Sequence, residues 1–197
     1  MKKWMPWAII GGVVLLLLLI VGANYNSLVS KREQVKNQFS NLEAQYQRRS
    51  DLVPNLVSTV KGSANFEQET LTQVVEARAK ATSIQVDSSN LSSDQIKQFQ
   101  SAQGELSSAL SRLLVVAENY PQLGTTQAFR DLQVQLEGTE NRITVARRDY
   151  NEATNTYNVA IKTFPSNITA MVFGFDEAVF FEADEGTQKA PTVNFGQ

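Results

Sequence analysis

Neither cysteine nor histidine occurs in this chain of 197 residues. Without cysteine there is no disulfide bond, no thiol nucleophile and no thiolate metal ligand. Without histidine there is no imidazole ligand and no catalytic dyad or triad that relies on a histidine base. Disulfide-stapled folds, thiol enzymes and histidine-based catalysis are therefore excluded.

A surplus of either charge is also lacking. The chain carries 18 lysines and arginines against 20 aspartates and glutamates, which gives a formal net charge of −2. A nucleic-acid-binding domain usually presents a strongly basic surface. We therefore expect no nucleic-acid partner.

The chain does contain a long apolar run, because residues 4–23 include no charged side chain. As a helix this run is roughly 30 Å long, which matches the hydrocarbon core of a bilayer. Trp4 and Trp7 suit the interfacial region of a membrane. We therefore expect residues 1–24 to form a membrane anchor whose partner is the lipid bilayer, through residues 4–23.

Two features of this segment bear on whether it is cleaved and on its orientation in the membrane. Val21, Gly22 and Ala23 resemble a signal-peptide cleavage site, although the apolar run is long for a signal peptide. Basic residues flank both ends, with Lys2 and Lys3 before the run and a second basic cluster after it. The first cluster contains no acid, which favours a single-pass protein with an extracytoplasmic C-terminal domain.

The next segment has the spacing of an amphipathic helix. Apolar residues recur at steps of three, four or seven, at Leu28, Val35, Phe39, Leu42, Tyr46, Val53, Leu56 and Val60. Arg49 occupies one position of the same stripe. Asp51 and Pro54 are typical of a helix start, but the spacing continues through both. The sequence therefore predicts one helix over residues 25–62, kinked at Pro54.

Three further helices are predicted, over residues 66–84, between Ser92 and Pro121, and over residues 126–164. Asn65 with Gln68, and Ser92 with Gln95, have the spacing of capping boxes. Glycine and proline are scarce in this part of the chain, and no strand-like alternation occurs. The predicted fold is all-α: an N-terminal transmembrane helix followed by a long antiparallel four-helix bundle over residues 25–165.

The C-terminal tail, residues 166–197, differs in composition and has a formal charge of −4. Its first part, Ile168 to Phe181, is the most apolar stretch outside the anchor. We expect this part to pack against the bundle or the membrane surface, and the end to be mobile. Alternatively it is a docking strip for other subunits or a membrane partner, since exposed apolar patches mark interaction sites. Its candidate interaction residues are Phe173, Phe175, Phe180 and Phe181.

Several motifs occur in order along the chain: Gln47-Arg48-Arg49-Ser50-Asp51-Leu52-Val53-Pro54-Asn55-Leu56-Val57, Ala77-Arg78, Glu118-Asn119-Tyr120-Pro121, Leu136-Glu137-Gly138-Thr139-Glu140-Asn141-Arg142-Ile143 and Ala146-Arg147-Arg148-Asp149-Tyr150-Asn151. In these motifs the chain resembles the LemA family of bacterial membrane-anchored proteins. The resemblance implies a long antiparallel four-helix bundle behind an anchor in the bacterial cell membrane. It implies no settled activity, although relatives are associated with magnetosome formation and with membrane proteases.

At Leu123-Gly124-Thr125 the chain lacks a lysine that is usual in the family. This departure puts any role of charge at this loop in doubt.

The polar block of the first helix supplies five candidate structural or contact residues: Arg48, Arg49, Asp51, Pro54 and Asn55. Arg49 lies on the apolar stripe, and a buried guanidinium needs a carboxylate or several carbonyl groups. Glu137 and Glu140 flank a core position of the longest helix. We predict that Arg48 or Arg49 pairs with Glu137 or Glu140 in an internal network. The alternative is a polar face that a partner engages.

Two Tyr-Asn steps lie seven residues apart on the longest helix, Tyr150-Asn151 and Tyr157-Asn158, with Arg147 one turn before them. This spacing places the two steps on the same face. One interpretation is that they are core tyrosines whose hydroxyl groups bond to neighbouring asparagines. The other interpretation is a polar groove for a peptide.

No metal, cofactor or catalytic site is predicted. Di-iron sites in four-helix bundles use Glu-x-x-His motifs, and this chain has no histidine. Glu137, Glu140 and Glu152 are spaced as solvated helix residues rather than as a carboxylate pair for glycoside cleavage.

The sequence favours a non-enzymatic, membrane-anchored scaffold or adaptor that self-associates as a homo-oligomer. The alternative is a regulatory or sensor module that binds a peptide or envelope component and modulates a membrane protease.

Overall fold

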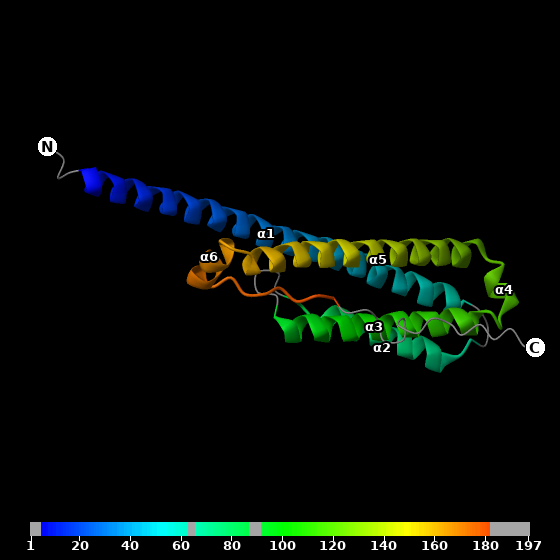
Figure 1. Ribbon diagram of the computed structural model, residues 1–197. Coiled ribbons are helices and arrows are strands. Elements are labelled where there is room, and N and C mark those ends of the chain that lie inside the picture. The colour runs from blue at the N-terminus through cyan, green and yellow to red at the C-terminus, as the bar shows by residue number, and fades with distance from the viewer. Residues whose placement is uncertain (1–4, 63–65, 87–91, 182–197) are drawn as a thin grey trace, which may run out of the picture.

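The computed structural model describes residues 5–62, 66–86 and 92–181. Every regular element in these ranges is a helix, and no strand occurs among them. The all-α prediction is therefore confirmed. Figure 1 shows an elongated arrangement in which the N-terminal part of the first helix extends beyond the other helices.

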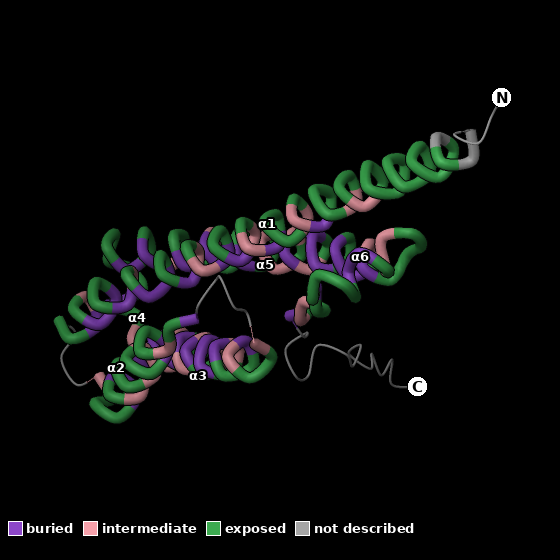
Figure 2. Tube along the Cα trace, turned by 90° about the vertical axis from the view of Figure 1, so that its left-hand side faces the viewer, coloured by how far each residue is buried: buried purple, intermediate pink, exposed green. Residues whose placement is uncertain are grey.

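The first helix, α1, runs from Met5 to Lys61 with Pro54 inside it. The prediction of one helix through the polar block is therefore confirmed, and this helix is continuous with the apolar run. Large apolar side chains from Ile9 to Leu19 are exposed, and this part of α1 is long and apolar enough to cross a membrane. Figure 2 shows this exposed stretch and the buried stretch that follows it.

The other helices are α2 (Gln68–Ser83), α3 (Ser93–Ala117), α4 (Pro121–Gly124), α5 (Gln127–Lys162) and α6 (Ser166–Phe173). The cap at Ser92 is confirmed, because its Oγ accepts a hydrogen bond from the Gln95 backbone N–H at 3.3 Å. The capping box at Asn65 is wrong, because the N-cap of α2 is Glu67; Asn65 itself lies outside the described residues. The short helix α4 was not predicted. The predicted third helix reaches only as far as Pro121, but proline also fits the first turn of a new helix.

Packing between the helices creates two apolar clusters. Helices α1 and α5 lie side by side, and α2 packs on both α3 and α1. The proximal cluster, nearer the exposed part of α1, includes Leu28, Val35, Phe39, Tyr46, Phe99, Ile143, Tyr150, Tyr157, Phe175 and Phe181. The distal cluster includes Val53, Leu56, Val60, Leu71, Val74, Leu106, Leu113, Phe129, Leu132 and Leu136.

The first part of the tail belongs to this core. Helix α6 contacts α1 and α5, and the chain then turns back along α5 as an extended segment up to Phe181. Phe175 and Phe181 are buried in the proximal cluster, whereas Phe173 and Phe180 are exposed. The prediction that the apolar part packs against the bundle is therefore confirmed, and the end of the tail lies outside the described residues.

Candidate functional site

A buried arginine crosses from α1 to two other helices between the proximal and distal clusters. Arg49 is 2% exposed. Its Nη1 donates to Glu140 Oε2 of α5 at 3.1 Å, and its Nη2 donates to the backbone oxygen and to Oε1 of Gln103 of α3, at 2.8 and 2.9 Å. The predicted pairing is confirmed as Arg49 with Glu140. Arg48 is exposed, and Glu137 bonds within α5 to Gln133.

Pro54 explains a second cross-helix contact in the same layer. A proline has no backbone N–H, so the carbonyl four residues earlier loses its helical donor. That carbonyl belongs to Ser50, which is 1% exposed. Arg78 of α2 supplies the missing donor, with its Nε 2.9 Å from the Ser50 oxygen. The proline therefore creates a free acceptor on α1 that ties α2 to it.

Tyr46 completes this layer on the side of the proximal cluster. Its hydroxyl group accepts a hydrogen bond from Arg147 Nε of α5 at 2.7 Å. The guanidinium groups of Arg49 and Arg147 lie 5.1 and 5.9 Å from its ring centroid, in reach of cation–π attraction. The polar layer is defined here as Tyr46, Arg49, Ser50, Arg78, Gln103, Glu140 and Arg147. It connects α1, α2, α3 and α5.

The sequence prediction missed four members of the polar layer: Tyr46, Ser50, Arg78 and Gln103. Gln103 and Arg78 occupy positions in the apolar stripes of their helices, and a polar residue at such a position is a signal for a buried partner. Conversely, Asp51 and Asn55 were candidates but are exposed. Asp51 accepts a hydrogen bond from Gln47 within α1 at 2.9 Å. The polar block therefore has one face in the layer and one face at the surface.

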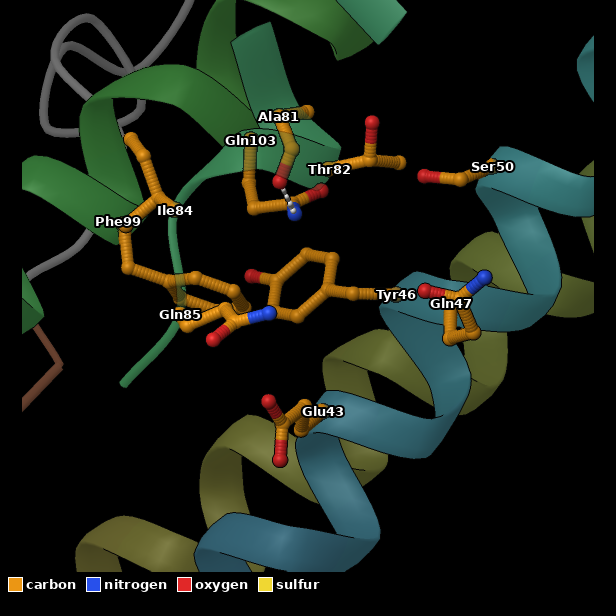
Figure 3. Close-up of a pocket in the computed structure, with 10 residues that line it drawn as sticks. All are labelled: Glu43, Tyr46, Gln47, Ser50, Ala81, Thr82, Ile84, Gln85, Phe99 and Gln103. Carbon is orange, nitrogen blue, oxygen red and sulfur yellow. Dashed lines mark hydrogen bonds between the residues drawn. The ribbon is translucent and has the colours of Figure 1, made fainter. Parts of the chain in front are cut away.

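Beside the polar layer is a cavity of about 210 Å³, shown in Figure 3. Its lining comes from α1, from α2 with the residues after it, and from α3: Glu43, Tyr46, Gln47, Ser50, Ala81, Thr82, Ile84, Gln85, Phe99 and Gln103. Burial raises the pKa of the Glu43 carboxyl group above its usual value. The lining has one carboxyl group and no basic side chain, so it provides no acid–base pair for catalysis.

The two Tyr-Asn steps of α5 bind the chain's own tail. Asn158 makes two hydrogen bonds to the backbone of Ala178, at 2.8 and 2.9 Å, and Asn151 makes two to the backbone of Phe181, both at 2.9 Å. Each asparagine thus satisfies the N–H and C=O of one extended residue, as a neighbouring strand would. We call this surface the Tyr-Asn groove, formed by Tyr150, Asn151, Tyr157 and Asn158.

The tyrosines of the groove bond to the same segment. The Tyr150 hydroxyl group donates to the Val179 oxygen at 2.7 Å, and the Tyr157 hydroxyl group donates to the Asp176 oxygen at 2.9 Å. The interpretation that the asparagines satisfy the tyrosine hydroxyl groups is therefore wrong. The groove does hold a peptide segment, and the segment is residues 176–181 of this chain.

The Tyr150 contact predicts a loss of stability at alkaline pH. Burial raises the pKa of Tyr150 to about 12, against about 10 for an exposed tyrosine. The stabilisation is fully present below about pH 10, and it is lost as the pH rises to about 12, because the unfolded chain ionises first. Tyr150→Phe removes this titration. We expect the wild type to be the more stable protein at pH 9 and its advantage to shrink by about 1 kcal/mol at pH 11. Urea unfolding at both pH values measures the difference, and an unchanged advantage would contradict the prediction.

Carboxylates do not cluster in the described part of the chain: no group of three Asp, Glu, His or Cys residues there is arranged to hold a metal ion. Glu137 and Glu152 are exposed on α5. The buried guanidinium of Arg49 is engaged by three acceptors. The arrangement is suited to holding helices together.

These features define a class: a helical protein whose first helix carries a candidate membrane span and whose buried polar groups connect its helices. The sequence pattern of the LemA family matches residues 38–195. This range covers most of the chain and includes both the polar layer and the Tyr-Asn groove. The chain belongs to the LemA family.

Named relatives agree with this assignment. The chain is 27% identical over 177 residues to magnetosome protein MamQ 1 of Paramagnetospirillum magneticum, covering 80% of this chain and 64% of the relative. It is 27% identical over 176 residues to magnetosome protein MamQ of Magnetospirillum gryphiswaldense, with the same coverage. It is 26% identical over 180 residues to protein LemA of Metamycoplasma hominis, covering 87% of this chain and 78% of the relative. The chain thus spans a little under two thirds of the length of the MamQ relatives.

Proposed function

We propose that this protein is a non-enzymatic scaffold or adaptor, anchored in the bacterial cell membrane by residues 4–23 and self-associating as a homo-oligomer. The observation that carries the proposal is the continuity of α1. One helix of 57 residues contains the apolar run from Met5 onward and also Tyr46, Arg49 and Ser50 of the polar layer. The anchor and the helical body are thereby joined without a flexible linker, which suits a protein that holds partners at a fixed position relative to the membrane.

The antiparallel four-helix bundle is part of this proposal. Helices α1, α2, α3 and α5 all contribute side chains to the distal cluster, and the polar layer links the same four helices. Buried polar contacts of this kind favour one arrangement of helices over alternatives. We place the bundle on the extracytoplasmic side, following the acid-free basic leader at Lys2 and Lys3.

The non-enzymatic part of the proposal is supported by how the polar side chains are used. In the described residues, the Arg49 network and the Tyr-Asn groove are occupied by contacts within the chain. Glu140→Gln provides the test, since Glu140 is the acid of the polar layer. Any turnover of a substrate that this substitution abolishes would overturn the proposal.

Assembly is tested on the full chain purified in mild detergent. We expect light scattering after size-exclusion chromatography to give a homo-oligomer, after the detergent mass is subtracted. A monomer over a wide concentration range would contradict self-association. Intact mass spectrometry of the same sample tests the anchor, because loss of the first 23 residues would show a cleaved signal peptide.

A second candidate function is a regulatory or sensor module that binds a peptide or envelope component and modulates a membrane protease. The Tyr-Asn groove favours it, because four asparagine hydrogen bonds recognise backbone atoms rather than side chains. Such recognition accepts many sequences in an extended conformation. The chain's own segment 176–181 would then compete with the ligand.

This second function predicts binding in trans. A fluorescent peptide with the sequence of residues 174–181 should bind a Phe181→Ala variant, whose own tail is loosened, more strongly than the wild type. Adding Asn151→Ala and Asn158→Ala should abolish binding, because the backbone acceptors and donors of the peptide lose their partners. Fluorescence anisotropy measures the affinity. Binding that survives both asparagine substitutions would rule out the groove as the receptor.

A further inference from the structure

Helix α6 presents an uncharged apolar face that is exposed in the part of the chain that the structure describes. Ile168, Met171 and Val172 are 52%, 84% and 70% exposed, and their spacing of three and four residues puts them on one side of the helix. Phe164, just before α6, is 76% exposed. Residues 163–175 contain no charged side chain. Exposed apolar surface of this kind marks a contact with another molecule or with lipid.

The position of α6 places its exposed face near the end of the candidate membrane span. The ring of Phe173 lies 4.9 Å from the ring of Tyr25, and Phe175 lies 5.7 Å from it. Tyr25 is the second residue after the apolar run 4–23, so it lies about 3 Å further along the helix axis. Figure 1 shows α6 at the end of the helical body from which the N-terminal part of α1 extends. The apolar face of α6 is therefore level with the end of the candidate span.

The orientation of α6 is fixed by its other face. Thr169 and Ala170 are buried, and α6 contacts both α1 and α5. Gly174 ends the helix at φ 69°, a left-handed conformation that favours glycine, and the chain returns to bury Phe175. Arg32 lies over the Phe175 ring at 5.2 Å, which adds a contact behind the helix. The exposed face cannot turn inward without breaking these contacts.

We propose that the exposed face of α6, with Phe164, lies in the interfacial region of the lipid bilayer. The proposal rests on the proposed anchor, because the anchor brings α6 to the level of the headgroups. A face with no charge matches the boundary between headgroups and acyl chains, where apolar and aromatic side chains of short amphipathic helices are buried. The helical body then has two attachments to the membrane, α1 and α6, and these two attachments fix its tilt.

The chain contains no cysteine, so a single introduced cysteine can be labelled at one known position. This allows the proposal to be tested by site-specific fluorescence. We would label Met171→Cys, Leu16→Cys and Val134→Cys in the full chain with an environment-sensitive fluorophore. Leu16 reports on the candidate span, and Val134 is an exposed apolar residue of α5 outside it, 67% exposed. The proteins are reconstituted in vesicles of phosphatidylcholine and phosphatidylglycerol, with nitroxide-labelled lipids that place the quencher near the headgroup or at mid-chain.

We expect the label at Met171 to show blue-shifted emission and to lose most of its intensity to the shallow quencher. The label at Leu16 should be quenched at mid-chain, and the label at Val134 should be quenched by neither lipid. Quenching at Leu16 without quenching at Met171 would overturn the α6 proposal and leave the anchor in place. No quenching at either position would overturn both. A blue shift at Met171 without lipid quenching would show that protein covers this face, and would also overturn the proposal.

Discussion

Phe181→Ala should lower the free energy of unfolding by about 3–5 kcal/mol, the usual cost of emptying a buried phenylalanine site. Phe181 is 4% exposed, although it lies in the tail, outside every helix. Its ring centroid lies 5.4 Å from that of Tyr150 and 6.4 Å from those of Phe39 and Phe99. The side chain therefore fills space between α1, α3 and α5, and alanine would leave a cavity there.

Phe180→Ala is the matched control for this prediction. The two residues are adjacent and identical in type, but Phe180 is 41% exposed. Its substitution should cost less than about 1 kcal/mol. Denaturant unfolding followed by circular dichroism gives the stability difference, and hydrogen exchange of the amides at Ala178 and Phe181 shows whether the tail has left the groove. Equal effects of the two substitutions would mean that the tail is not part of the core.

Arg49→Ala should have an effect of similar size, about 3–5 kcal/mol, because it empties a buried site and leaves the buried Gln103 side chain without its donor. The guanidinium of Arg49 donates hydrogen bonds to the backbone oxygen and Oε1 of Gln103 and to Glu140. Alanine would remove the donors of all three acceptors. It would also leave a void between the proximal and distal clusters.

Two control substitutions show how much of the Arg49→Ala effect comes from the burial of the side chain and how much from its charged partner. Arg48→Ala removes the same side chain from an exposed position of the same helix, and should cost under about 1 kcal/mol. Glu140→Gln keeps the shape of the acid and an oxygen that can accept from Arg49 Nη1, and the Glu140 side chain is 48% exposed, so water reaches it. We therefore expect Glu140→Gln to cost clearly less than Arg49→Ala. A small effect of Arg49→Ala in denaturant unfolding would show that the guanidinium is hydrated despite its position.

Spacing in the sequence was sufficient to predict much of the helical body. The apolar stripe passes through Asp51 and Pro54 without a change of phase, and α1 is continuous there. The place of Arg49 on that stripe led to its pairing with an acid of the longest helix, and Glu140 is that acid. Both predictions depended on the apolar periodicity within individual helices, which is the information that a sequence expresses most directly.

Contacts with backbone atoms could not be predicted in the same way. Arg49 donates to the main-chain oxygen of Gln103, and Arg78 donates to that of Ser50. Every residue has a main-chain oxygen, so the sequence does not indicate which one a side chain will bind. The asparagines of the Tyr-Asn groove also bind backbone atoms, on a segment that lies 20 or 30 positions further along the chain. Spacing located the groove on one face of α5, but it gave no information about which segment would occupy it.

The missing N–H of Pro54 has a consequence for how α2 is aligned along α1. In an uninterrupted helix the interior carbonyl groups are all engaged, so a neighbouring arginine would find equivalent positions at every turn. Within α1, Pro54 removes the helical donor of the Ser50 oxygen, and Arg78 binds to that oxygen. Sliding α2 by one turn would leave this oxygen buried without a donor and the guanidinium opposite an acceptor already in use. The bond from Arg78 to the Ser50 oxygen therefore favours one longitudinal registry of the two helices, in addition to the apolar packing between them.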